Sequence, residues 1–355
     1  LVFRTQLSAG LSSARQGLYI GKGAVSNVES GYVSPLATIN NSFSYGYSWD
    51  NTLTYDFTLA DDHRFTLTGV TSWSKNQHDK NDMRGQGQSL DYYLFYNIAA
   101  GTEKSGIKSS FSQTQKMSYA FRFNYSYLGR YLVSFTTRWD GVSHLAEGHK
   151  WAAFPAGAVG WRISDEKFMR GTEKWLSNLK LRFSYGVSGN SGGMGAYSSQ
   201  TGAHTFAQVS ADGATVPHNQ LSAPYANPSI SWEKSYNKDF GIDLGLFGGR
   251  IDLTFDWYNT DTKDLLFSRT LPITSAITMW GSPINTWQNI GETNNKGYEI
   301  SLTTHNIKRK DFNWTTTFTF THNEEKIVKL PDGDLVAKNL FEGYPVKTFR
   351  NFKYA

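Results

Sequence analysis

Hydrophobic and polar residues alternate with a period of two along much of this chain. In 119–127 the odd positions all hold Tyr or Phe, and the even positions hold small or polar residues. The same alternation recurs over 179–185, 239–246 and 251–257. Because successive side chains of a β-strand point to opposite faces, this pattern predicts strands with one apolar and one polar face. About a dozen such segments can be counted, which predicts an all-β fold.

The connections between these segments differ in length in a regular way. Short links are predicted at 60–63, 129, 248–249 and 308–311, and long ones at 74–88, 141–150, 191–229, 260–290 and 322–345. From residue 129 onward short and long links alternate, except that the link 164–178 is of medium length and reads as a small helical turn. Short turns at one rim and long loops at the other are typical of outer-membrane barrels. We therefore expect an antiparallel transmembrane β-barrel segment, with the turns at Gly129 and Gly248 periplasmic and the long loops extracellular.

The aromatic content supports a membrane barrel over a water-soluble domain. The chain has 11 Trp, 20 Tyr and 23 Phe, or 15% aromatic residues, although its mean hydropathy is negative. A transmembrane barrel combines an apolar face toward lipid, a polar lumen and aromatic girdles at both interfaces. Four strand tryptophans are expected to be such anchors in lipid: Trp73, Trp139, Trp161 and Trp257.

Composition excludes several classes of chemistry. The chain has no cysteine, so disulfides, thiolate zinc sites and a thiol nucleophile are excluded. Its net charge of +5 is small and the basic residues form no run, so a nucleic-acid partner is not expected. No apolar run reaches the roughly 18–20 residues of a spanning helix. No HExxH, GxSxG or Walker motif is recognised, so no enzyme, cofactor or metal is expected. No signal peptide is recognised either.

Two groups of titratable residues are candidates for chemistry. His144, Glu147 and His149 share a predicted loop and could bind a metal, but a solvated loop is the preferred interpretation. Asp252 and Asp256 lie four residues apart on the same face of one strand and could form an acid/base pair, but solvation of a barrel lumen is preferred.

On the polar face of the predicted strands, charges of the same sign are grouped on neighbouring strands. Four successive strands place a basic residue there, and the next three place acidic residues; the two sets are Arg122, Arg138, Arg162 and Arg182, and Asp239, Asp243, Asp252, Asp256 and Glu299. The lumen would then have a basic wall and an acidic wall. Two interpretations stay open: the charges solvate a water-filled lumen, or they hold a charged plug domain.

Aromatic residues in the long loops are the candidates for substrate contact. Trp280 and Trp287 lie in the predicted loop 260–290, and Tyr197 and Tyr225 in the loop 191–229. Sugar rings have apolar faces that stack on Trp and Tyr, and loops on a rigid scaffold often carry binding. The alternative is that these rings pack the loops together or touch a partner protein.

An ordered series of short motifs supports a more specific assignment. In chain order they are Phe123–Leu132, Arg138–Ser143, Trp151–Pro155, Val159–Ser164, Trp175–Gly186, Asn227–Pro228, Trp232–Lys234, Gly241–Phe247, Asp261–Leu266, Asn289–Gly291, Asn295–Glu299 and Glu342–Val346. The series resembles the barrel of the SusC/RagA-like TonB-linked outer-membrane transporters of Bacteroidetes, from about residue 115 onward. The departures are Val142 and His144-Leu145, where the family usually has Ser and Arg-Phe.

The resemblance implies a barrel of about 22 strands with an N-terminal plug and a TonB box. It also implies location in the outer membrane of a Gram-negative bacterium, a SusD-like surface lipoprotein as partner, and uptake of oligosaccharides, or of peptides in the RagA branch, driven through TonB. We expect residues 1–355 to be part of one barrel domain, with the plug, TonB box, signal peptide and last barrel strands outside this chain.

Three alternatives to a glycan importer remain at this stage. One is an importer of peptides, siderophores or vitamins with the same architecture. Another is a soluble or surface β-rich adhesin built as a sandwich, which predicts strand aromatics buried between two sheets. The third is a passive porin, which would lack a plug.

Overall fold

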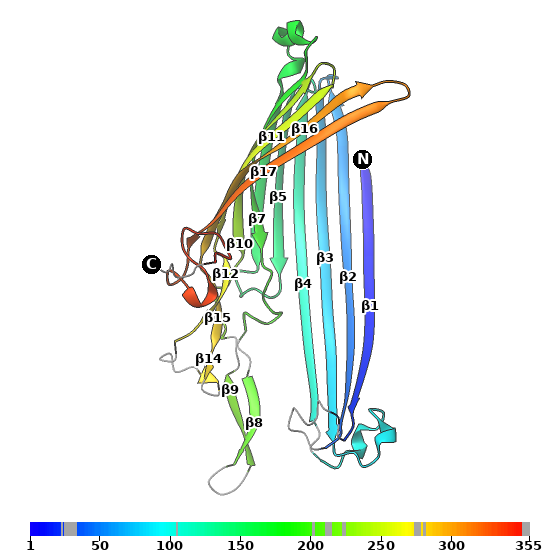
Figure 1. The fold of residues 1–355 in the computed structure, drawn as a ribbon, viewed down its shortest axis with the longest axis vertical. Helices are drawn as coiled ribbons and strands as arrows, with labels where there is room; N and C mark the ends of the chain where they lie inside the picture. The colour runs from blue at the N-terminus through cyan, green and yellow to red at the C-terminus, as the bar shows by residue number, and fades with distance from the viewer. Residues whose placement is uncertain are drawn as a thin grey trace. The chain divides into compact units, whose positions relative to one another are not determined.

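The computed structural model describes residues 1–22, 24, 34–103, 106–200, 203–209, 215–221, 225–272, 278–279 and 282–349. Its main element is an eleven-stranded sheet whose strand order is β1-β2-β3-β4-β5-β6-β7-β10-β11-β16-β17 (Figure 1). The strands are β1 Val2–Ile20, β2 Leu36–Leu59, β3 His63–Gln86, β4 Gly106–Tyr127, β5 Tyr131–Val142, β6 Trp151–Arg162, β7 Leu176–Asn190, β10 Glu233–Leu246, β11 Ile251–Lys263, β16 Glu292–Lys308 and β17 Asn313–Lys329. Each strand is hydrogen-bonded to the next strand of the sheet along the chain, which is the up-and-down order of a barrel wall.

The chain forms two compact units. The larger unit comprises Leu1–Arg4, Asn51–Thr71 and Ser118–Ala355, and the smaller comprises Thr5–Asp50 and Ser72–Met117. The boundaries fall inside β1, β2, β3 and β4, and each unit is described by itself below.

Strands of the larger unit pair in continuous antiparallel register from β5 to β17. One row of paired residues runs Leu132, Gly160, Arg182, Gly241, Asp256, Glu299 and Thr321. The adjacent row of paired residues, one position further along each strand, runs Val133, Val159, Phe183, Phe240, Trp257, Tyr298 and His322. Paired residues share a face of an antiparallel sheet. We call the face that carries Arg182 the polar face and the face that carries Phe183 the apolar face.

Tight turns join several of these strands at one end. Leu128 and Gly129 between β4 and β5 have φ values of 51° and 70°, and Phe247, Gly248 and Gly249 between β10 and β11 have values of 53°, 67° and 79°. Consecutive left-handed residues match the right-handed twist of a hairpin, and glycine adopts them without steric cost. Both hairpin turns were predicted from the sequence and are confirmed.

The medium link between β6 and β7 is a pair of short 3-10 turns. They are η3 Ile163–Asp165 and η4 Lys167–Thr172, as the sequence predicted for a small helical turn. Three more such turns are η1 Asp91–Tyr93, η2 Ile98–Ala100 and η6 Val336–Lys338. Among the described residues no helix has the length and apolar composition needed to cross a membrane.

Three small hairpins lie in the long connections. They are β8 Ala203–Val209 with β9 Thr215–Leu221, β12 Leu266–Thr270 with β15 Asn285–Asn289, and β13 Thr278–Met279 with β14 Ser282–Pro283. The main buried cluster of the larger unit combines loop residues with residues of β5 and β6; it is made of Val142, Leu145, Ala146, Phe154, Ile230 and Trp232. The packed part of this unit therefore lies where the long connections meet the sheet.

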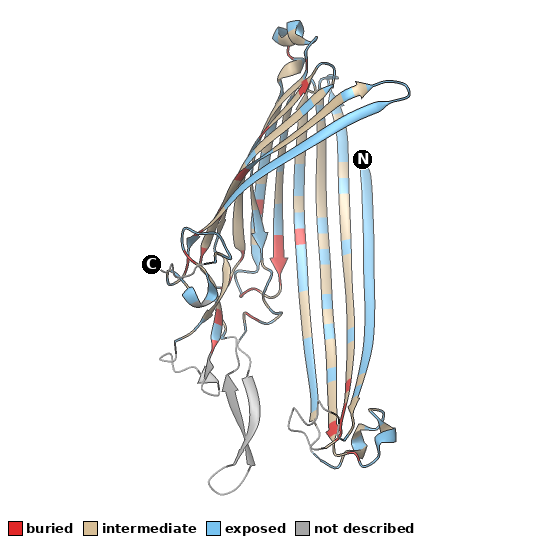
Figure 2. Cartoon of the chain, in the orientation of Figure 1, coloured by how far each residue is buried: buried red, intermediate tan, exposed pale blue. Residues whose placement is uncertain are grey.

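The apolar face of the sheet, in contrast, is open to its surroundings. Phe183 is 49% exposed and Phe135 is 44% exposed, although both lie in the middle of strands. Figure 2 shows buried residues only in short stretches of the sheet. An aromatic surface of this extent is not stable in water but is suited to lipid. The sandwich alternative, which requires strand aromatics buried between two sheets, is therefore wrong.

Two expected loop boundaries were wrong. The link 74–88 was predicted to be a loop, but β3 continues to Gln86, and β17 continues to Lys329 into the predicted link 322–345. The alternation signal disappears in this part of β3 because Lys75, Gln77 and Asp79 make both faces polar. A strand that is polar on both faces has no hydrophobic period to reveal it.

Candidate functional site

The polar face of the larger unit brings the predicted basic and acidic walls into contact at β7, β10 and β11. The Arg182 guanidinium binds both carboxylate oxygens of Asp243, at 3.0 Å from Nε and 3.0 Å from Nη2, and Nη2 also donates to Asp256 at 2.8 Å. Lys180 Nζ lies 3.9 Å from Asp243. The three charged side chains of the Arg182 network are 26–31% exposed, so bidentate geometry and partial burial make the network stronger than a surface ion pair.

Gly241 makes this network geometrically possible. It lies on β10 between Arg182 and Asp256 in the row of paired residues. A Cβ at this position would lie 2.5 Å from Asp256 Oδ1 and 2.6 Å from Arg182 Cζ. The guanidinium therefore crosses the intervening strand through space that only glycine leaves empty.

The same arrangement recurs two strands further on. The Tyr258 hydroxyl of β11 donates to Asn323 Oδ1 of β17 at 2.8 Å. A Cβ on Gly297 of the intervening β16 would lie 2.6 Å from that hydroxyl. Glycines on the polar face thus let long side chains connect strands that are not neighbours.

The other predicted charges of the polar face have more local partners. Arg138 donates to Asp140 on its own strand at 2.7 Å and to Ser118 at 3.1 Å, and Arg122 donates to Thr136 at 3.2 Å. Arg162 lies 3.9 Å from Asp165 at the start of the β6–β7 link. Within the described part of the chain, no ion pair is formed by Asp239, Asp252 or Glu299. The structure therefore leaves an acidic excess on β10, β11 and β16.

The long-loop end of the larger unit is held together by two asparagines. Asn289 accepts from the Ser231 backbone N–H at 2.7 Å and donates to the carbonyls of Ser231 at 2.9 Å and Asp264 at 3.0 Å. Asn227 donates to the Trp287 carbonyl at 2.9 Å. The Asn289 amide thereby makes the same two bonds that a β-strand partner would make, and it fixes the segment 227–231 to the hairpin β12–β15.

Two further contacts hold the following loop to the same hairpin. Arg269 Nη2 lies 2.6 Å from Asp332 Oδ1. Lys338 donates to the Ser268 carbonyl at 3.1 Å and lies 4.4 Å from the centre of the Phe267 ring. Described residues of four connections, 143–150, 225–232, 264–271 with 284–291, and 330–342, therefore contribute to one rim.

The predicted loop aromatics take different places on this rim. Tyr197 is 42% exposed and Tyr225 is 36% exposed, and the Tyr225 backbone is fixed by bonds to Asn285 and Thr286. Trp287 packs against the buried cluster, which favours the packing role over direct substrate contact. Trp280 lies outside the described residues.

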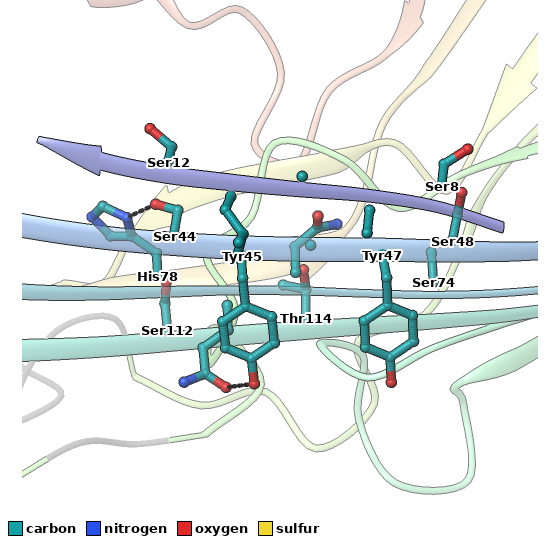
Figure 3. Close-up of a pocket in the computed structure, with 16 residues that line it drawn as sticks. Ser8, Ser12, Ser44, Tyr45, Tyr47, Ser48, Ser74, His78, Ser112 and Thr114 are labelled. Carbon is teal, nitrogen blue, oxygen red and sulfur yellow. Dashed lines mark hydrogen bonds between the residues drawn. The ribbon is translucent and has the colours of Figure 1, made fainter.

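The smaller unit presents a polar hollow of about 780 Å³ along β1 to β4 (Figure 3). Ser44 is hydrogen-bonded to His78 Nδ1 at 2.7 Å, and Tyr45 donates to Gln77 at 2.7 Å on the opposite side of the sheet. Hydroxyl and amide side chains are the most numerous in the lining, which also includes Leu11 and the rings of Tyr45 and Tyr47; the small polar residues are Ser8, Ser12, Ser48, Ser74, Asn76, Ser112 and Thr114. No Asp, Glu, Lys or Arg belongs to the described lining, so the hollow differs in charge from the polar face of the larger unit.

A buried carboxylate marks the opposite, short-turn end of the larger unit. Glu166 accepts from the Trp161 indole at 3.1 Å and from Arg130 at 3.3 Å. Hydrogen bonds from the Tyr131 hydroxyl and the Trp161 indole, together with the Arg130 charge, hold the pKa of Glu166 below its ordinary value although burial acts in the other direction. The β6–β7 link is thereby fixed to the β4–β5 turn.

Sequence reasoning missed the contacts among these residues, although it had noted the motifs that contain them. Arg182 belongs to the motif Trp175–Gly186, whereas Gly241 and Asp243 belong to the motif Gly241–Phe247; Asn227 and Asn289 likewise belong to two separate motifs. Their hydrogen bonds join segments 58 to 61 residues apart in the chain. The sequence therefore revealed the order of the motifs but not which motifs contact one another.

An exposed aromatic face, a charged polar face and short turns opposite long loops define an outer-membrane β-barrel protein. The family model described as TonB dependent receptor-like, beta-barrel matches residues 3–353. The chain therefore belongs to the TonB-dependent receptor-like β-barrel family and is part of an outer-membrane barrel.

Two curated relatives give the extent of the similarity. The chain is 36% identical over 289 residues to TonB-dependent receptor P3 of Formosa agariphila, covering 80% of this chain and 27% of that receptor. It is 32% identical over 322 residues to TonB-dependent receptor SusC of Bacteroides thetaiotaomicron, covering 84% of this chain and 30% of SusC. The chain thus spans less than a third of the length of either receptor.

Solved structures confirm the fold. The RagAB peptide importer in its open-open state superposes with a TM-score of 0.79 at 22% identity, covering 97% of this chain and 37% of that one. A second RagAB peptide transporter structure gives a TM-score of 0.78 at 24% identity, covering 93% and 35%. The expected SusC/RagA-like barrel architecture is confirmed by these comparisons.

Proposed function

We propose that this chain is the barrel segment of a TonB-dependent importer that takes up oligosaccharides together with a SusD-like surface lipoprotein. The observation that carries the proposal is the family match over almost the whole chain, joined to a sheet with a lipid-suited apolar face and a polar face. Energy would come through TonB, which would engage a region of the receptor outside this segment. The segment binds and guides solute and catalyses nothing.

Two features of the structure support a neutral, hydroxyl-rich solute. The polar hollow of the smaller unit is lined by hydroxyl and amide groups, which exchange hydrogen bonds with sugar hydroxyls without requiring a charge. At the rim of the larger unit, Tyr197 and Tyr225 present exposed rings on an ordered backbone. Stacking on such rings is the usual contribution of Tyr to recognition of an amphipathic ligand.

The second candidate is a peptide importer. The Arg182 network and the acidic excess of β10, β11 and β16 place both signs of charge on the polar face, which suits a zwitterionic solute. The alternative function of these charges is to hold a plug domain, as the sequence analysis allowed. The RagAB comparisons support the same architecture and do not bear on which solute this receptor imports.

The test uses the full-length receptor, purified from outer membranes with whatever lipoprotein accompanies it. Binding of a panel of neutral oligosaccharides and of oligopeptides would be measured by isothermal titration calorimetry. We expect oligosaccharide binding that weakens about tenfold in Tyr197→Ala or Tyr225→Ala, the loss of one stacked ring. Tyr298→Ala, at an exposed position of the apolar face, is the control and should bind as the parent does.

The outcomes separate the candidates. Binding of peptides but not oligosaccharides would replace the first proposal by the second. Oligosaccharide binding that is unchanged in both rim variants would retain the importer and remove the two tyrosines from the site. A receptor purified with no lipoprotein would contradict the partner assignment.

A further inference from the structure

A shallow hollow of about 370 Å³ lies on the apolar face next to the short-turn end of the sheet. Side chains from four neighbouring strands line it on this face: Val133, Val159, Trp161, Leu181, Phe183 and Phe240. All six are apolar or aromatic. The hollow belongs to the larger unit and is separate from the rim and the polar face.

The register explains why the apolar face is hollow here. Val133 pairs with Val159, so two small β-branched side chains lie opposite each other. On the side toward the short turns they are followed by the Tyr131–Trp161 pair, whose rings stack with centroids 6.4 Å apart. Phe183, the next residue in the row after Val159, closes the hollow laterally. The two valines are smaller than the rings around them, so they leave an apolar slot in the surface, and an apolar chain placed there would contact side chains on several sides.

The β6–β7 link lies at the end of this slot. Its Glu166 carboxylate binds Trp161 and Arg130, at 3.1 and 3.3 Å, and also the Tyr131 hydroxyl. Tyr131 and Trp161 both belong to the apolar face, so the link is held on the lipid side of the sheet. The negative charge of Glu166 is compensated within the protein and is not available to a ligand.

The link exposes basic groups next to an exposed ring. Lys167, Arg170 and Lys174 are all exposed, and the exposed carboxylates of the link are Glu173 and Asp165, the second of which lies 3.9 Å from Arg162. Phe168 is 68% exposed in the same link. A short segment with cations and an exposed aromatic ring has the composition of a surface that lies at a membrane interface.

We propose that the slot and the link form a binding site for one phospholipid of the periplasmic leaflet. An acyl chain lies over Val133 and Val159, and the phosphate is bound by Lys167, Arg170 and Lys174. Three observations select this occupant: the slot has an apolar lining, it is continuous with the lipid-facing surface of the barrel, and the cations belong to the link that Glu166 holds to Trp161 at the end of the slot. The site is independent of the solute that the receptor carries.

The test compares lipid retention by native mass spectrometry of the full-length receptor, purified in mild detergent and titrated with phosphatidylglycerol. Each basic group near an anionic lipid surface contributes roughly fivefold in affinity. The triple variant Lys167→Gln/Arg170→Gln/Lys174→Gln is therefore expected to bind phosphatidylglycerol at least about tenfold more weakly. The charge-preserving variant Lys167→Arg/Arg170→Lys/Lys174→Arg should bind as the parent does.

Two further variants separate the effect of the slot from a general effect of lost positive charge. Val159→Phe fills the slot and should lower retention while leaving the link intact, and Lys150→Gln/Lys234→Gln/Lys329→Gln removes three charges at the long-loop end of the larger unit as the matched control. Heat-dependent migration in SDS gels confirms that each variant is folded. The proposal is overturned if the triple Gln variant retains phosphatidylglycerol as the parent does. It is also overturned if that variant loses lipopolysaccharide instead, because the link would then face the outer leaflet.

Discussion

At the scale of single residues, glycine on the polar face is a structural requirement of the charge network. Gly160 and Gly241 are the two neighbours of Arg182 in the row of paired residues. A Cβ on Gly160 would meet its nearest atoms at 3.5 Å, an ordinary contact, whereas one on Gly241 would meet the network at 2.5–2.6 Å. Only at the second position would a methyl group have to displace side chains of the network.

We predict that Gly241→Ala displaces the Arg182 guanidinium from Asp256. The loss of one charge-assisted hydrogen bond between partly exposed groups should cost about 1 kcal/mol and lower the thermal midpoint of the receptor by about 1–3 °C. The midpoint is read from heat-dependent migration of the folded barrel in SDS gels. Gly160→Ala is the matched control and should leave the midpoint unchanged; equal effects of the two variants would disprove the role given to Gly241.

The Glu166 carboxylate is the basis of a second prediction, which concerns how the stability of the receptor depends on pH. Its pKa is lowered in the folded receptor by Tyr131, Trp161 and Arg130. A lowered pKa contributes stability that is fully present above the ordinary value of 4.5 and is lost as the pH falls through the lowered value. Glu166→Gln should therefore lower the thermal midpoint at neutral pH, and this difference should shrink below pH 4.5.

The control for this prediction is Glu173→Gln, which removes an exposed carboxylate of the same link. It should change the midpoint little at either pH. A difference between the parent and Glu166→Gln that stays constant from neutral to acid pH would mean that the hydrogen-bonding shape of the side chain matters and its charge does not.

At the scale of elements, most strands could be predicted because their two faces differ. Alternation over 119–127 and 179–185 placed β4 and β7 correctly, and paired glycines marked the β10–β11 hairpin. The far part of β3 could not be predicted, because Lys75, Gln77 and Asp79 remove the contrast between faces. Sequence periodicity reports an apolar surface, so it ends where that surface ends.

The candidate site was less predictable than the strands for a related reason. The basic and acidic residues of the polar face were identified, but their contact at Arg182 depends on register, which no local pattern of charges determines. The same applies to Trp287: its sequence context gives a loop aromatic, and only the packing of the rim shows that it lies against the buried cluster. Contacts between distant segments are set by the pairing of strands.

The hairpin β12–β15 and the segment 225–232 allow a prediction at this scale. Asn289→Ala removes the side chain that binds Ser231 twice and Asp264 once. We expect amide hydrogen exchange of residues 225–232 to become about tenfold faster, because those residues lose their main connection to the hairpin. Gln288→Ala on the same strand is the control, and exchange as slow in Asn289→Ala as in the control would show that the segment is held by other contacts.

At the scale of the whole molecule, the two faces of the sheet meet different solvents, and this difference can be measured on adjacent residues. Phe135 and Ser134 are neighbours in β5 and point to opposite faces. An arginine on the lipid face of a barrel near the bilayer midplane costs about 2–4 kcal/mol, whereas a lumen position tolerates it.

We therefore expect Phe135→Arg to reduce strongly the fraction of full-length receptor that folds in the outer membrane, and Ser134→Arg to fold like the parent. The fraction is measured from heat-dependent migration of isolated outer membranes. If Ser134→Arg were the more damaging of the two, the assignment of the faces would have to be reversed, and with it the lipid site on the apolar face and the solute path on the polar face.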